Sequence, residues 1–210
     1  NKKLNSSFIG SFQEKNLLMA ILAAKICRIR LNKILSKLNK IKSINGRLQL
    51  ARTLPNQTKI FIDFAHTPEA LQKTIESLKK HYNRNINLVF GCGGNRDIKK
   101  RSLMANIANK LCNKIYVTDD NPRKENPKSI RKTIIKFLDK GKYYDIGNRA
   151  NDIRAAINHS DPFEIILIAG KGHETTQDYG NKIIKISDKS IISATKVRQS
   201  KLNNNLINYY

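Results

Sequence analysis

IILIAGKGHE, which spans residues Ile165–Glu174, is the stretch of sequence that decides the fold. Its first half is a run of apolar residues, and its second half sets two glycines beside Lys171, His173 and Glu174. A continuous apolar run that ends in glycines indicates a strand buried on both faces. Such strands lie in parallel sheets that helices cover on both sides, so we predict an α/β fold around this segment.

Strands and helices are predicted to alternate on both sides of this segment. The predicted strands lie at residues 60–64, 86–90, 115–118, 143–146, 165–169 and 183–186. The predicted helices lie at residues 68–81, 100–112, 127–138, 148–158 and 188–197. We therefore predict a Rossmann-like, doubly wound, mostly parallel six-stranded sheet. Sheets of this kind bind ligands at the loops that follow the carboxyl ends of their strands.

The segment before residue 55 has a different pattern. Apolar residues at helical spacing between residues 12 and 38 predict two helices, which have no sheet of their own to cover. A short strand and an exit loop are predicted at residues 46–54, and Pro55 follows them. We therefore predict that residues 1–54 end one domain, that residues 55–200 form a second domain, and that residues 201–210 are a flexible tail.

The composition argues against several classes of protein. The chain has 210 residues, with 40 Lys and Arg against 16 Asp and Glu, and its net charge is +24. Its apolar runs are shorter than the roughly 20 residues of a membrane span, and its first residues do not resemble a secretory signal. Cys27, Cys92 and Cys112 have neither disulfide nor zinc spacing, which indicates a cytoplasmic protein with reduced thiols.

The positive charge is spread along the chain and is not concentrated in one segment. Lys, Asn and Ile are all abundant, which is typical of AT-rich codon usage. We interpret the excess of lysine as a solvated surface, and we expect neither a specific nucleic-acid partner nor a membrane span. A basic nucleic-acid-binding domain is the alternative from another class of protein.

Four of the predicted strand ends carry unusual polar sequences. They are DFAHTPEAL at residues 63–71, FGCGGNRDIKKR at 90–101, TDDNPR at 118–123 and AGKGHE at 169–174. Each of them alone could be a helix cap or a tight turn. Because all four fall on the same edge of one sheet, a ligand site is the better interpretation. None is a GxGxxG loop, so the sheet alone does not support a nicotinamide-dependent dehydrogenase.

Together these four motifs resemble the Mur ligases, a family of ATP-dependent amide ligases in peptidoglycan precursor synthesis. IGSFQEKN at residues 9–16 and NGR at 45–47 agree with this resemblance, which extends from about residue 9 to residue 194. Gln13 and Gln49 depart from the family, which usually has Asn and Glu at these positions. A folylpolyglutamate-like ligase shares the AH-x-P turn but is expected to lack DNPR together with GKGHE.

The resemblance implies that this chain is part of a three-domain enzyme. In the family, an amino-terminal domain holds a UDP-sugar, a central domain binds ATP through a P-loop, and a carboxyl-terminal domain brings the amino acid. The chain resembles the end of the central domain and the whole carboxyl-terminal domain. ATP and Mg²⁺ are then bound largely outside it, and its partners are small-molecule substrates and the two missing domains. We expect the isolated chain to be inactive, and we assign it no catalytic residue and no metal ligand.

The resemblance also implies which amino acid is added. A DNPR motif accompanies the members that add meso-diaminopimelate to UDP-MurNAc-L-Ala-D-Glu, and Arg123 suits the second carboxylate of that amino acid, which lysine lacks. Another Mur-type ligase or a lysine-adding member is the alternative. The residues implied for diaminopimelate are Arg96, Asp120, Asn121, Pro122, Arg123, Gly170 and Glu174. Those implied for ATP are Asn16, Arg47, Asp63 and His66, while Lys171 and His173 receive no role.

Overall fold

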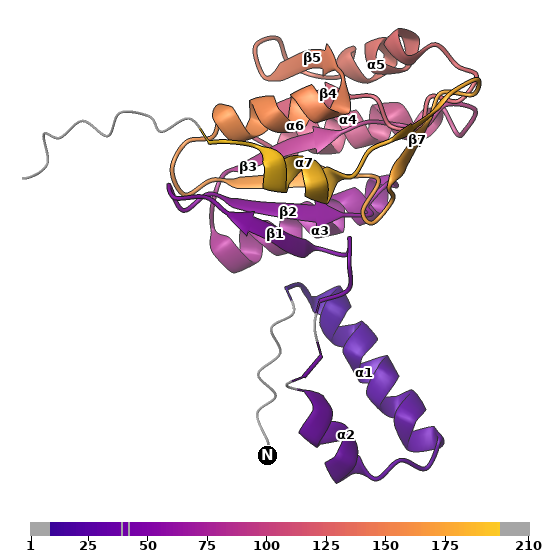
Figure 1. Ribbon diagram of the computed structural model, residues 1–210, viewed down its shortest axis with the longest axis vertical. Helices are drawn as coiled ribbons and strands as arrows, with labels where there is room; N and C mark the ends of the chain where they lie inside the picture. Colours follow the sequence, from indigo (N-terminus) through magenta and orange to yellow (C-terminus); the bar gives the residue numbers. More distant parts are fainter. Residues whose placement is uncertain (1–8, 39, 42, 198–210) are drawn as a thin grey trace, which may run out of the picture.

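A six-stranded sheet forms the centre of the protein in a computed structural model that describes residues 9–197 apart from 39 and 42. The strands lie in the order β1-β2-β6-β3-β4-β5, and all neighbours are parallel except β1 and β2 (Figure 1). Their bounds are β1 Gln49–Thr53, β2 Lys59–Asp63, β3 Ile86–Phe90, β4 Lys114–Thr118, β5 Tyr143–Gly147 and β6 Ile165–Ala169. The predicted fold class is confirmed, and the tail predicted at residues 201–210 lies outside the described residues.

Helices cover both faces of the sheet, which explains why the central strands are apolar throughout. Every residue of β3 and β6 is buried. Alternate residues of each strand enter two separate cores, so that Leu167 packs on one face and Ile168 on the other. The first core is completed by α3 (Pro68–Tyr82), α4 (Lys99–Leu111) and α5 (Pro127–Ile135), and the second by α6 (Arg149–Asn158) and α7 (Asp188–Ala194).

Local sequence fixes where several of these helices begin. Thr67 caps α3 by accepting a hydrogen bond from the backbone N–H of Ala70, and Pro68 fills the first helical position. Asn126 and Pro127 start α5 in the same way. A side-chain oxygen at the cap satisfies a backbone N–H group that has no partner inside the helix. The loops after β2 and β4 are therefore held at both of their ends.

Two predicted strands have different partners from those expected. The strand predicted at residues 183–186 is β8 (Ile183–Lys185), which pairs with β7 (Thr176–Asp178) in a separate two-stranded hairpin. The sixth strand of the sheet is β1, an antiparallel edge strand. Ile183 is 70% exposed, because the hairpin lies outside both cores. The sheet thus begins before the domain boundary predicted after residue 54.

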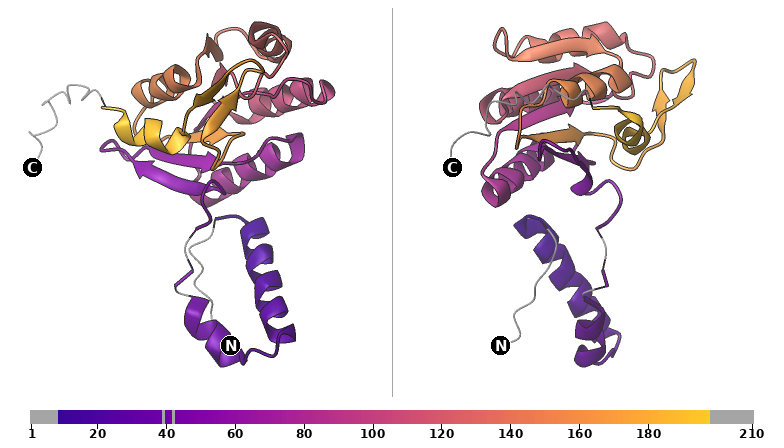
Figure 2. Two further views of the ribbon diagram at one scale, coloured as in Figure 1. Left: turned by 45° about the vertical axis from the view of Figure 1, so that its right-hand side comes forward. Right: turned by 60° about the vertical axis from the view of Figure 1, so that its left-hand side comes forward.

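The two helices predicted near the amino terminus are α1 (Ser11–Ile26) and α2 (Leu31–Leu38). They extend away from the sheet as a hairpin of helices (Figure 2). Leu18, Met19, Leu22 and Ile26 of α1 are exposed, and α2 buries no residue. In the described part of the chain, no helix combines the length and the apolar character that crossing a bilayer would need.

Candidate functional site

The loops after β3 and β4 are interlocked at the carboxyl edge of the sheet. The backbone N–H of Gly94 donates to the carbonyl of Asn121 over 2.9 Å. A Cβ atom on Gly94 would lie 1.9 Å from the carbonyl oxygen of Pro122, which is closer than any real contact. Only glycine fits there, so this glycine serves the close packing of two loops. Pro122, one of the predicted substrate residues, is buried and contributes its backbone to the same packing.

Arg123 lies at the junction of these two loops. Its Nη1 donates to the carbonyls of Gly94 over 2.9 Å and of Asn121 over 3.3 Å. Its Nε lies 4.0 Å from Oδ2 of Asp178, and its side chain is 29% exposed. The guanidinium is therefore held in one place by backbone oxygens while part of it stays accessible to a ligand.

The loop after β6 meets the DNPR turn through three side chains. Nζ of Lys171 lies 2.8 Å from Oε2 of Glu174 and 3.2 Å from Oδ1 of Asn121. Nδ2 of Asn121 donates to the same Oε2 over 3.2 Å. Burial alone would raise the pKa of Glu174, but Lys171, the Asn121 amide and the nearby charge of Arg149 together hold it below its ordinary value. Glu174 is thus a carboxylate at neutral pH.

Two more of the predicted substrate residues set the shape of the loops. Oδ1 of Asp120 accepts the backbone N–H of Asn121 over 2.7 Å. Gly170 has φ +109°, and a Cβ atom there would lie 2.8 Å from Oδ2 of Asp120. The positive φ and the close carboxylate both require glycine. Asp120 and Gly170 therefore bring the β4 and β6 loops together.

Arg96 is the one predicted substrate residue that the structure leaves apart from the others. It is exposed, and within the described residues it makes no hydrogen bond or ion pair. Arg101 in α4 instead forms two 2.7 Å hydrogen bonds with Glu125, joining the β3 loop to the segment after the DNPR turn. The structure thus brings Arg123 and Glu174 together through Asn121 and does not bring Arg96 into that contact.

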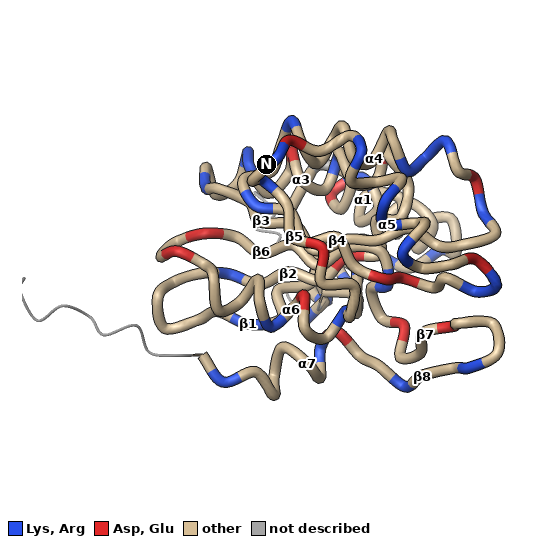
Figure 3. Tube along the Cα trace, turned by 90° about the horizontal axis from the view of Figure 1, so that it is seen from above, with Lys and Arg blue, Asp and Glu red and all other residues tan. Residues whose placement is uncertain are grey.

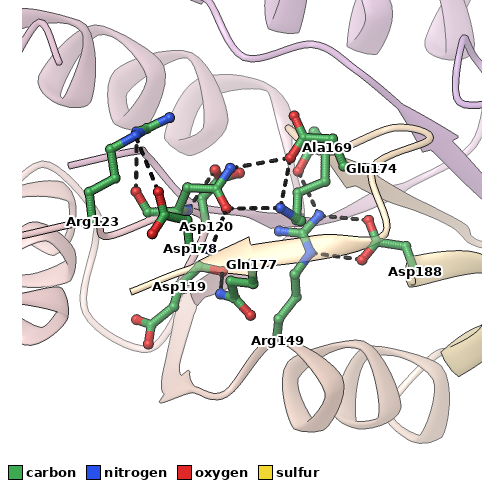
Figure 4. A network of polar contacts seen from close by, with 11 residues as sticks. Asp119, Asp120, Arg123, Arg149, Ala169, Glu174, Gln177, Asp178 and Asp188 are labelled. Carbon is green, nitrogen blue, oxygen red and sulfur yellow. Dashed lines mark hydrogen bonds and ion pairs between the residues drawn. The ribbon is translucent and has the colours of Figure 1, made fainter. Parts of the chain in front are cut away.

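Arg149 at the start of α6 and Asp188 at the start of α7 form a buried ion pair next to the end of β6. The sequence analysis missed both residues. Nε and Nη2 of Arg149 each lie 2.8 Å from the carboxylate of Asp188, and Nη2 also donates to the carbonyl of Ala169 at the end of β6. Both side chains are fully buried. Figure 4 shows Arg123 beside Asp178 at one end of the polar network and Arg149 beside Asp188 at the other. The pair is separated by 39 residues, so no local pattern could have revealed it.

The β7–β8 hairpin packs against the same turn. The backbone N–H of Asp178 donates to Oδ1 of Asn121, and the backbone N–H of Arg123 donates to the carbonyl of Asp178, both over 2.9 Å. Nε2 of Gln177 donates to the carbonyl of Asp119, and the Tyr179 hydroxyl donates to its carboxylate. The hairpin therefore also fixes the DNPR turn, in addition to the β3 loop.

Three of the four residues predicted to contact ATP, namely Arg47, Asp63 and His66, lie near the start of α3, and they differ in how they are held. The guanidinium of Arg47 lies 4.4 Å from the centre of the Phe64 ring, and the His66 ring meets the same ring edge-on at 4.7 Å. The carboxylate of Asp63, by contrast, accepts hydrogen bonds from the backbone of Leu48 and of Ala65. Arg47 and His66 are exposed, whereas Asp63 is buried and bound within the chain.

Asn16 lies on the exposed surface of α1. That helix contacts the sheet domain near Arg47, because Nε2 of Gln13 donates to the carbonyl of Arg47 over 3.2 Å. No group of three or more His, Cys, Asp or Glu side chains suited to a metal ion occurs among residues 9–197, with 39 and 42 left aside.

Comparisons with known proteins agree on one family. Residues 46–172 match the family described as "Mur ligase, glutamate ligase domain". The chain is 45% identical over 190 residues to the UDP-N-acetylmuramoyl-L-alanyl-D-glutamate--2,6-diaminopimelate ligase of Rickettsia felis, covering 90% of this chain and 35% of that protein. It is 36% identical to the ligase of the same name from Buchnera aphidicola, covering 90% and 38%.

Solved structures give the same result. A structure of a UDP-N-acetylmuramoyl-L-alanyl-D-glutamate--2,6-diaminopimelate ligase superimposes with a TM-score of 0.70 at 31% identity, covering 91% of this chain and 39% of that one. A folylpolyglutamate synthase from Mycobacterium tuberculosis superimposes with a TM-score of 0.64 at 18% identity, which shows a shared fold. The chain thus spans about two-fifths or less of the length of the relatives described here.

Proposed function

Because the chain belongs to the Mur ligase family, we propose that it supplies the amino-acid-binding part of an ATP-dependent ligase. That ligase joins meso-diaminopimelate to UDP-MurNAc-L-Ala-D-Glu. The names of its relatives at 36–45% identity support this choice. The observation that carries the proposal is the contact between the DNPR turn and the β6 loop, where Asn121 links the guanidinium of Arg123 to the carboxylate of Glu174.

The charges of these side chains suit the distal end of diaminopimelate, which carries both a carboxylate and an ammonium group. Arg123 is partly exposed and offers a planar pair of donors to the carboxylate. Glu174 is ionised at neutral pH and accepts the ammonium group. Lysine has the ammonium group alone, so it would leave the guanidinium without an anion, and this difference favours diaminopimelate.

The reaction asks the protein to position charged groups more than to form covalent bonds. A carboxylate of the peptide attacks the γ-phosphorus of ATP and forms an acyl phosphate with release of ADP. The amine of the amino acid then attacks the acyl carbon, and phosphate leaves with the C–O bond electrons. We infer that Arg47 and His66, which flank Phe64, face the nucleotide, while Asp63 fixes the backbone that carries His66. No step is assigned to Mg²⁺ on this chain.

The domain assignment follows from the same proposal. The helices α1 and α2 form the end of the central ATP-binding domain, and the sheet from β1 onward forms the carboxyl-terminal domain. Exposed apolar residues along α1 support this division, because a helix that ends a larger domain would bury them there.

Reconstitution tests the proposal. The chain is mixed with separately expressed amino-terminal and central domains of the Rickettsia felis relative, and ATP-dependent ligation to UDP-MurNAc-L-Ala-D-Glu is measured with each amino acid. We expect product with meso-diaminopimelate and little with lysine. The carboxyl-terminal domain of that relative serves as the positive control. Product with lysine alone, or no product where the control is active, would contradict the proposal.

A further inference from the structure

Lys171 is a buried lysine at the centre of the candidate site. Its side chain is 1% exposed, although an unpaired ammonium group inside a protein is costly. The structure pairs it with two acceptors, Oε2 of Glu174 at 2.8 Å and Oδ1 of Asn121 at 3.2 Å. Both acceptors belong to residues that the proposed function places against the substrate, so the lysine is in direct contact with the binding groups.

Lys171 helps to decide which way the Asn121 amide points. Oδ1 of Asn121 accepts from two donors, Nζ of Lys171 and the backbone N–H of Asp178. The amide nitrogen must then face Glu174, to which it donates over 3.2 Å. An amide in the reverse orientation would set its N–H groups against both donors, so Lys171 and the backbone N–H of Asp178 together exclude that orientation.

This arrangement leaves two complementary groups for a ligand. Nδ2 of Asn121 has a second hydrogen, and within the part of the chain that the structure describes neither that hydrogen nor Oε1 of Glu174 takes part in a hydrogen bond. The first can donate to a carboxylate and the second can accept from an ammonium group. The carboxylate and ammonium groups at one end of a diamino diacid are complementary to this pair.

We propose that Lys171 is a positioning residue of the amino-acid site, which holds the Asn121 amide and the Glu174 carboxylate in the orientation that receives the distal carboxylate and ammonium groups. The inference rests on the proposed function for the identity of the ligand. Lys171 touches no reacting atom in this scheme. It acts through its two neighbours, and Arg149 contributes a further positive charge near Glu174.

The test uses the 210-residue chain with Lys171→Met, and Lys182→Met as the matched control, because Lys182 is an exposed lysine on the nearby hairpin. Three quantities are measured: the side-chain amide NMR resonances of Asn121, the pKa of Glu174 by carboxyl NMR titration, and the dissociation constant of meso-diaminopimelate by calorimetry. We expect K171M to shift the amide resonances, to raise the pKa of Glu174, and to weaken binding about tenfold or more. K182M should match the wild type in all three.

Two further variants separate positioning from simple destabilisation. Lys171→Arg keeps the charge and should restore the Asn121 resonances and most of the affinity, whereas Lys171→Gln should not restore the pKa of Glu174. If K171M does not fold, K171Q is judged by the same three criteria. Unchanged Asn121 resonances together with unchanged affinity would overturn the inference. A wild-type chain that binds no meso-diaminopimelate would refute the proposed ligand instead, and the resonances and the pKa would then decide the role of Lys171.

Discussion

At the scale of single residues, the buried carboxyl group of Asp152 opposes folding at neutral pH. It lies in α6, and neither of its oxygens has a hydrogen-bond partner within the described residues. Burial raises its pKa from 3.8 to about 7, against the opposing influence of the nearby charges of Arg131 and Arg149. The folded state therefore binds a proton more tightly than the unfolded state does, so stability falls as the pH rises from about 4 to about 7.

We predict that Asp152→Asn stabilises the protein above pH 7. The raised pKa corresponds to a cost of up to about 4 kcal/mol for the ionised form, and asparagine removes this cost. The gain in the free energy of urea unfolding should be largest at pH 8 and should vanish below about pH 4. Asp139→Asn, at an exposed carboxylate, is the control. A gain that is the same at pH 4 and pH 8 would show that this carboxyl group does not titrate between those values.

Arg123 gives a prediction about specificity. Arg123→Ala should weaken the binding of meso-diaminopimelate by about tenfold to a hundredfold, since hydrogen bonds to charged groups contribute about 1.5–3 kcal/mol. Arg123→Lys should recover only part of this, because an ammonium group lacks the planar pair of donors. Weak binding of lysine should not change. Calorimetry measures the affinities, with Lys124→Met as the exposed neighbouring control, and an equal loss for both amino acids would count against pairing with the second carboxylate.

The sequence revealed the residues of the site that belong to strand-end motifs and missed those that support them. Arg123 and Glu174 could be found because each follows a predicted strand within a polar motif. The role of Lys171 depends on its burial, which the motif does not show. Arg149 and Asp188 pair across two helix starts, and each alone resembles an ordinary charged residue in a first turn. Arg96 was expected in the same contact, yet it extends from an exposed loop.

At the scale of elements, the sequence predicted the buried strands together with their place in the sheet, but for β1 and β8 it predicted the strand without its partner. β3 and β6 are apolar on both faces, and that pattern has one interpretation inside an α/β sheet. β1 and β8 are partly exposed, and their patterns do not specify a partner. β1 pairs antiparallel with β2, because the loop between Thr53 and Lys59 is shorter than the crossover of about a dozen residues that a parallel pair needs. β8 follows β7 after a short turn, and the two strands pair with each other in a hairpin outside the six-stranded sheet.

A buried ion pair between Arg149 and Asp188 joins α6 and α7 beside their apolar contacts. Asp188→Asn leaves the guanidinium of Arg149 as an uncompensated buried charge, and we expect a loss of about 3–5 kcal/mol in the free energy of unfolding. Asp161→Asn breaks the pair with Lys114, in which the aspartate side chain is 71% exposed, and should cost less than about 1 kcal/mol. Chemical denaturation measures both values. Similar losses for the two variants would mean that burial does not decide the contribution of these pairs.

The net charge of +24 is a property of the whole molecule. Figure 3 shows Lys and Arg distributed over helices and loops around the sheet. Such a surface attracts polyanions through the release of counterions, without reading a sequence. We predict that the chain binds unrelated DNA duplexes with equal affinity at about 50 mM salt. It should lose most of this binding when the salt concentration reaches about 200 mM. Filter binding measures it, and retention of one sequence at high salt would favour the nucleic-acid-binding alternative.

The helices α1 and α2 should open independently of the sheet domain. Their side chains are mostly exposed. Among the residues of α1 whose burial is described, only Gln13 is buried. Local opening costs little free energy where few apolar side chains are buried. We predict that backbone amides of residues 11–38 exchange with deuterium at least about 100-fold faster than those of β3 and β6. In the reconstituted ligase, the amides of α1 should become slower to exchange, because Leu18, Met19 and Leu22 would be covered by the central domain. Exchange of α1 that is equally fast with and without the other domains would show that this helix packs on neither of them.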